Sequence, residues 1–76
     1  MMTDLVVVEV ELTDGQRYVF PDVAVAMLNT VLRLMSWPKV DNVVLVNVQG
    51  ACLSIPKHPI IRITAGSEEV WCASPA

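Results

Sequence analysis

The sequence predicts an α+β fold, with a single α-helix packed on a small antiparallel β-sheet in the order β-β-α-β-β-β-β. Residues 22–36 have the composition and apolar periodicity of a helix. The segments on either side are short and rich in valine and isoleucine, as strands are. Turn signals join neighbouring segments into hairpins, whose strands run antiparallel. A chain of 76 residues makes a single domain, 1–76.

The first hairpin is predicted from strands at 5–12 and 16–20, joined by a turn that contains Asp14 and Gly15. A two-residue loop would mix charged side chains into the apolar face. A three-residue loop with Gly15 in the left-handed conformation separates the two kinds of side chain, so we favour it. This register pairs Glu11 with Arg17, Val10 with Tyr18 and Val8 with Phe20.

The helix is predicted at 22–36, after Pro21 ends the second strand, with Asp22 as its N-cap. Its apolar residues cover about 200° of the circumference, whereas a helix on one sheet needs little more than about 100°. We therefore expect a curled sheet, long loops or a second chain to cover the surplus. The polar stripe consists of Asp22, Ala26, Asn29, Arg33 and Ser36.

The second half of the chain is predicted to contain a loop, 37–42, and then strands at 43–49, 52–55 and 60–64. We expect Trp37 to anchor the loop. Side chains alternate along the strand that follows it. We expect Val44, Val46 and Val48 on the inner face of the sheet, and Val43, Leu45, Asn47 and Gln49 on the outer face.

The last hairpin is predicted to turn at Gly66-Ser67, with its final strand ending at Cys72. The expected pairs are Thr64 with Glu69, Ile63 with Val70, Arg62 with Trp71 and Ile61 with Cys72. This register directs Ile61, Ile63, Val70 and Cys72 towards the core. It also lays Arg62 over Trp71 on the outer face, as a cation–π pair.

The composition indicates a chain that works in contact with other chains. Hydrophobic residues make up 54% of the sequence and charged residues 17%, against a usual charged content of about 25%. A domain of this size buries only about 60% of its unfolded surface, so its core cannot hold every apolar side chain. The surplus is exposed or covered by a partner.

Charge and hydropathy narrow the classes of partner. The formal net charge is −3, and the five basic residues are scattered, so we expect no nucleic acid as the primary ligand. No apolar run is long enough to span a membrane, and no signal peptide is recognisable. We expect the chain to be cytoplasmic where it is synthesised and to contact protein, either itself or a larger assembly.

No motif carries a specific chemistry. His58 is the only histidine, in the loop Pro56–Pro59, and no acid lies near it in the sequence. Cys52 and Cys72 have no metal-ligand spacing, and we expect free, buried thiols unless their strands are neighbours. The carboxylate pairs Glu9 with Glu11 and Glu68 with Glu69 are typical of a solvated face. We therefore predict no catalytic, cofactor-binding or metal-binding residues and no enzyme activity.

The predicted function is that of a non-enzymatic structural or assembly protein. It would act as an oligomer, or as an accessory, decoration or cement subunit of a viral (phage) particle, and would then be located in the virion. The alternative is a small acidic inhibitor or regulator of a host protein. The candidate interface residues are Leu5, Val7, Val23, Leu34, Trp37, Val43, Leu45 and Trp71.

Overall fold

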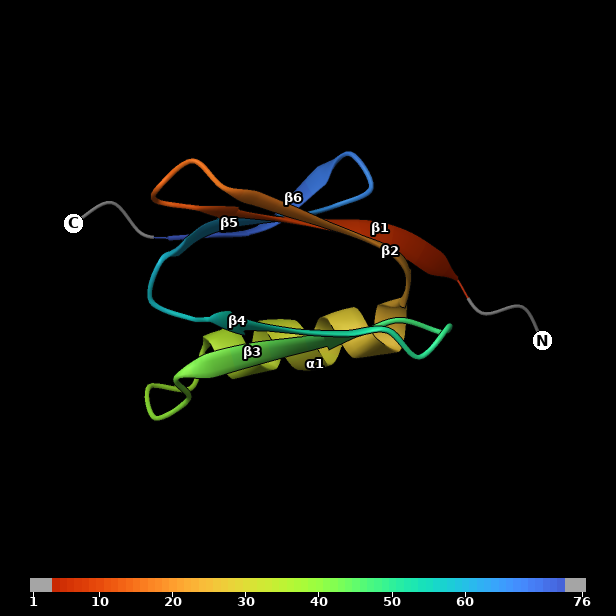
Figure 1. Cartoon of the computed structure of the whole chain (residues 1–76). Coiled ribbons are helices and arrows are strands. Elements are labelled where there is room, and N and C mark those ends of the chain that lie inside the picture. Colours follow the sequence, from red (N-terminus) through yellow and green to blue (C-terminus); the bar gives the residue numbers. More distant parts are fainter. Residues whose placement is uncertain (1–3, 74–76) are drawn as a thin grey trace.

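The computed structural model describes residues 4–73, and between them the chain forms one helix and six strands in two layers (Figure 1). The elements are β1 (Leu5–Leu12), β2 (Arg17–Ala24), α1 (Val25–Met35), β3 (Asn42–Val46), β4 (Cys52–Pro56), β5 (Ile60–Ala65) and β6 (Glu68–Cys72). The predicted fold class and element order are confirmed. All strand pairs are antiparallel.

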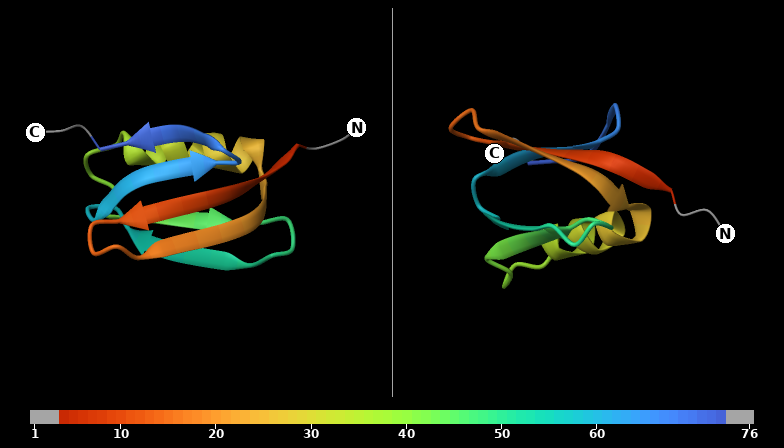
Figure 2. Two further views of the ribbon diagram at one scale, coloured as in Figure 1. Left: turned by 90° about the horizontal axis from the view of Figure 1, so that it is seen from above. Right: turned by 45° about the vertical axis from the view of Figure 1, so that its right-hand side comes forward.

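The strands divide between two sheets. One layer is a four-stranded sheet in the order β2-β1-β5-β6. The other layer consists of the β3–β4 hairpin and α1, which lies alongside β3 (Figure 2). The inner faces of the two layers pack on each other, and the core lies between them. Its buried residues are Val8, Val10, Leu12, Val23, Leu28, Val31, Met35, Val43, Leu45, Ile55, Ile60 and Ile63.

The register predicted for the first hairpin is confirmed. Glu11 pairs with Arg17 and Val10 with Tyr18. Gly15 has φ +88°, in the left-handed region, and its N–H donates to the carbonyl of Leu12 at 3.0 Å. A side chain is disfavoured in this conformation, so glycine fixes the loop length and with it the register.

The start of the helix differs from the prediction. β2 continues through Pro21 and Asp22 as far as Ala24, and the helix begins only at Val25. Pro21 and Asp22 together face one residue of β1 and so form a bulge, in which Asp22 has φ +60°. An edge strand with a bulge tolerates a proline that lacks an N–H. Asp22 is therefore not the N-cap; Ala24 holds that position, without a side-chain hydrogen bond.

Asp22 instead connects β2 to the turn of the β3–β4 hairpin. Its carbonyl accepts a hydrogen bond from the Val48 N–H at 3.0 Å, and its Oδ2 accepts one from Gln49 Nε2 at 2.8 Å. Asn47 Oδ1 accepts from the N–H groups of Gln49 and Ala51, both at 3.0 Å. These bonds fix the end of the hairpin against the end of the four-stranded sheet.

The orientation predicted for β3 is wrong. Val43 and Leu45 are buried, while Val44 and Val46 face outwards. Both sets of alternating side chains are apolar, so the sequence pattern could not decide between them. Asn47 shares the buried face, where it holds the turn described above.

The wide apolar surface of α1 is covered largely within the chain. Leu28, Val31 and Met35 are buried, and Leu32 and Met27 pack against the same core. The helix meets the four-stranded sheet on one side and β3 on another, so two neighbours replace the single sheet that was expected. A second chain is not needed to explain most of this surface.

The last hairpin keeps only part of its predicted register. Thr64 pairs with Glu69 as predicted, but a bulge then shifts the pairing, so that Ile63 faces Trp71 and Arg62 faces Cys72. As a result Trp71 packs against the core and Cys72 is exposed, the reverse of the prediction. A bulge in one strand cannot be read from local spacing, because it depends on the partner strand.

The orientation of β3 can be tested with two neighbouring valines. We expect Val43→Ala to lower the free energy of unfolding by about 2 kcal/mol, because it removes buried methyl groups and leaves a cavity. Val44→Ala makes the same chemical change one residue further along, at a side chain that is 36% exposed. We expect it to cost less than about 1 kcal/mol. Urea unfolding measures both values, and the opposite ranking would contradict the structure.

Candidate functional site

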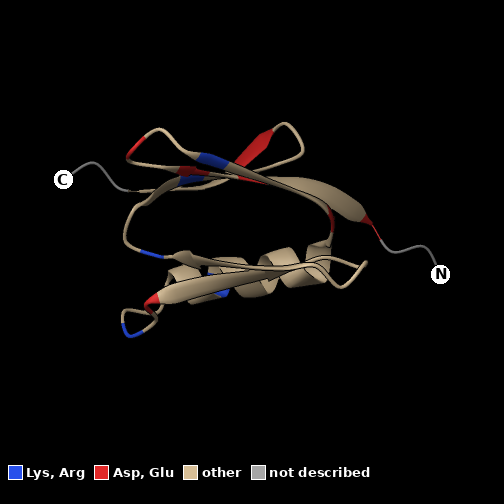
Figure 3. Cartoon of the chain, in the orientation of Figure 1, with Lys and Arg blue, Asp and Glu red and all other residues tan. Residues whose placement is uncertain are grey.

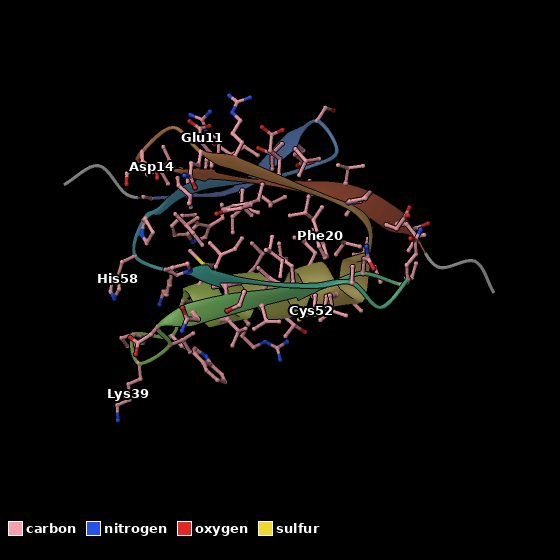
Figure 4. All side chains as sticks on the ribbon, in the orientation of Figure 1. Glu11, Asp14, Phe20, Lys39, Cys52 and His58 are labelled. Carbon is pink, nitrogen blue, oxygen red and sulfur yellow. The ribbon has the colours of Figure 1, made fainter. Side chains whose placement is uncertain are left out.

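The histidine and the two cysteines lie on different parts of the chain, and Figure 4 shows Cys52 and His58 at separate places. His58 is exposed in the loop between β4 and β5. Cys52 lies on β4 and Cys72 on β6, in different sheets, and both are free and exposed. The prediction that the cysteines are free is confirmed, whereas the prediction that they are buried is wrong. The three side chains do not form a nucleophile–base arrangement.

Three of the five carboxylates on the strands of the larger sheet, those of Glu9, Glu11 and Glu69, are paired with arginines on its outer face. Arg17 Nη1 lies 3.1 Å from Glu9 Oε1, and Arg62 Nε lies 2.9 Å from Glu69 Oε1. Glu11 Oε1 lies between the two arginines, 3.8 Å from Arg17 and 3.5 Å from Arg62. These five residues form a charge ladder that alternates in sign across all four strands of the sheet, and their side chains are between 23% and 60% exposed. It solvates this face and offers little unpaired negative charge to a ligand.

Residues 4–73 contain none of the other features on which a small-molecule site is usually built. Within them no three His, Cys, Asp or Glu residues lie close enough to hold a metal ion, and no pocket is present. Over the same residues, no helix has the length and apolarity needed to cross a membrane. A candidate functional site therefore has to be sought on the outer surface.

The outer surface of the β3–β4 hairpin is the most apolar exposed part of the second layer. Val44 and Val46 alternate along β3 and are 36% and 37% exposed, and Val48, in the turn that follows, is 58% exposed. On β4 the neighbouring exposed residues are Cys52 and Ser54, which pair with Val46 and Val44. These five residues are called the hairpin outer face below.

The charges of the chain are distributed unequally between the two layers (Figure 3). The four strands of the larger sheet carry seven charged residues. The elements of the other layer carry one, Arg33 on α1. The hairpin strands themselves have none. Exposed apolar residues that stand singly are ordinary, but a contiguous uncharged group indicates a contact surface.

The structure separates the candidate interface residues predicted from the sequence. Leu5 and Val7 are exposed on β1, and Trp37 is exposed at the end of the other layer. Leu34 and Trp71 are partly buried. Val23, Val43 and Leu45 are buried inside the chain's own core, so their expected place on an outer surface is corrected. The eight residues do not form one surface.

The hairpin outer face was missed because Val44, Val46 and Val48 were assigned to the core. Asn47 alternates with Val43 and Leu45, and a polar residue in that set indicated that the set faces solvent. The buried Asn47 side chain is instead satisfied by two backbone N–H groups of the turn. An asparagine directly before a Gly-containing turn is the local signal that could have corrected the assignment.

The charge ladder allows a test of its own. We expect Arg62→Gln to lower the free energy of unfolding by less than about 1 kcal/mol, because exposed ion pairs are screened by solvent. The loss should shrink further in high salt. Arg33→Gln is the control, because Arg33 makes no ion pair with the described residues. A loss several-fold larger, or one that is independent of salt, would show that the ladder has a greater structural role.

Comparisons with protein-family models, with curated proteins and with solved structures find no match. The hairpin outer face is exposed and uncharged, and three of its five residues are valines.

Proposed function

We propose that this chain is a non-enzymatic structural or assembly protein that acts through protein–protein contacts. It would be a subunit of a homo-oligomer, or an accessory, decoration or cement subunit of a viral particle. The observation that carries the proposal is the hairpin outer face, in which Val44 and Val46 are exposed on a strand without charge and Val48 is exposed in the turn that follows it. Covering this face would remove apolar surface from water, which is the main driving force of protein association.

The composition supports the same proposal. Hydrophobic residues make up 54% of the chain, yet the core between the two layers holds twelve buried hydrophobic side chains. Large apolar residues outside that core remain exposed on both layers, among them Trp37 and Val19. Aromatic residues such as Trp37 are enriched at protein interfaces. A small assembly subunit gains stability from its neighbours where its own core is thin.

The alternative of an acidic inhibitor draws less support from the charges. Mimicry of nucleic acid needs unpaired carboxylates arranged on one face. Here Glu9, Glu11 and Glu69 are paired with Arg17 and Arg62 on the outer face of the larger sheet. A contact surface of apolar character is therefore the better-supported basis for binding.

Two aspartate substitutions test the proposal. Val46→Asp places a charge in the hairpin outer face, and Val19→Asp places one on the opposite layer, at a valine that is 60% exposed. We expect the unmodified chain to sediment as more than one copy of its 8.3 kDa mass, or to copurify with a partner. Val46→Asp should abolish any association that covers the hairpin outer face, because a buried charge is costly. Val19→Asp should leave it intact.

Two results would contradict these expectations. Analytical ultracentrifugation of the unmodified chain could give 8.3 kDa at micromolar concentration, with no copurifying protein. That result would contradict the proposal. Equal behaviour of the two variants would contradict the assignment of the hairpin outer face. Circular dichroism of both variants controls for the retained fold.

A further inference from the structure

Three strand edges of the described chain have no neighbouring strand: those of β2, β4 and β6. The remaining edge, along β3, faces α1 (Figure 2). Free edges expose unpaired backbone groups, and proteins usually guard them with charge, proline or bulges. The three free edges therefore differ in how readily another strand can pair with them.

Two of these edges carry charged residues together with a proline or a bulge. β2 carries Arg17 and, at its bulge, Pro21 and Asp22. β6 carries Glu68 and Glu69, and a bulge shifts its pairing with β5. By contrast β4 contains no charged residue, and its register with β3 is regular throughout. Pro56, at the end of β4, has no N–H that could pair with another strand.

The backbone groups on the β4 edge can be identified. The Lys57 N–H donates to the Asp41 carbonyl at 2.8 Å, and the Ala51 carbonyl accepts from the Asn47 N–H at 3.1 Å. Residues 51 and 57 therefore direct their backbone groups towards β3. Because these groups alternate in direction along a strand, those of 53 and 55 also point to β3. Cys52 and Ser54 then direct their N–H and C=O groups to the free edge.

We propose that β4 pairs antiparallel with β4 of a second copy of this chain, across a two-fold axis at Leu53. This deepens the proposed function by naming the partner, and it rests on that function. Cys52 of each copy then lies opposite Ser54 of the other, and every free N–H and C=O of these two residues is paired. Pro56 falls outside the paired segment. The two hairpins become one continuous four-stranded sheet.

A second copy suits this edge better than an unrelated strand does. An antiparallel edge is self-complementary under two-fold symmetry, so a copy presents the required donors and acceptors without further design. The chain has net charge −3, but the hairpin strands carry none of it, so two copies meet here without like-charge repulsion. The hairpin outer faces of the two copies lie side by side across the axis and stay uncovered, so Val46→Asp should leave this pairing intact.

The pairing forms a closed dimer, because no unguarded edge remains among the described strands to which a third copy could add. Each copy has one unguarded edge, and the far side of its hairpin is occupied by α1. Leu53 is only partly buried in the single chain. On the axis it lies directly opposite Leu53 of the second copy, so the remaining exposed part of its side chain is covered as well.

The first test removes an edge donor. We expect light scattering after size exclusion to give twice the 8.3 kDa chain mass for the unmodified protein and 8.3 kDa for Ser54→Pro. Proline at this position lacks the N–H and its ring blocks the approaching strand. Ser54→Thr retains the donor and should remain dimeric. A monomeric unmodified protein, or a dimeric and folded Ser54→Pro, would overturn the proposal.

The second test does not depend on the folding of the proline variant. In a Cys72→Ser background, Ser54→Cys places a new thiol opposite Cys52 of the other copy. Opposite residues of a hydrogen-bonded pair lie about 5.5 Å apart at Cα, within the range that a disulfide spans. We expect oxidation to give a covalent dimer on a non-reducing gel. The Cys72→Ser parent should not crosslink comparably, because its Cys52 residues are diagonal neighbours about 7–8 Å apart.

Failure of this inference can be told from failure of the proposed function. If the protein associates and Val46→Asp prevents it, but the position-54 variants neither dissociate nor crosslink, the β4 pairing is wrong and the proposed function stands. If the protein neither associates with itself nor copurifies with a partner, both are wrong. Equal crosslinking of the Ser54→Cys variant and its parent also overturns the pairing.

Discussion

The inner face of the four-stranded sheet is wider than one helix can cover. Four strands spaced by about 4.8 Å span roughly 15–20 Å, whereas a helix with its side chains is about 10 Å across. α1 covers part of this face with Leu28, Val31 and Met35. The β3–β4 hairpin covers the rest with Val43, Leu45 and Ile55. The second layer stabilises the fold because it removes the apolar face of the sheet from water.

Using a hairpin as the second cover determines the outer surface of the protein. A strand buries one set of alternating side chains and exposes the other. Once Val43 and Leu45 enter the core, Val44 and Val46 must face outwards. The hairpin is a separate sheet that is not paired with the larger one, so β4 forms a free edge. The buried core and the exposed apolar side chains of the hairpin are thus two consequences of one arrangement.

The sequence allowed local features to be predicted but not those that depend on distant partners. Gly15 and the opposite charges of Glu11 and Arg17 specify the first hairpin, and its register was predicted correctly. Pro21-Asp22 resembles the start of a helix, yet it forms a bulge that only pairing with β1 produces. The orientation of β3 depends on which layer the hairpin joins, and both of its faces are apolar. The exposed valines of the hairpin were therefore assigned to the core, whereas Leu5 and Val7, which were expected at an interface, are exposed.

Amide hydrogen exchange on β4 tests the central claim most directly, because it reports whether the outward N–H groups are free or paired. The Leu53 and Ile55 amides, which point to β3, should be protected at every protein concentration. The Cys52 and Ser54 amides should exchange quickly in dilute protein and become protected as concentration rises and copies pair. If they exchange quickly at every concentration, the hairpin does not pair with a second copy.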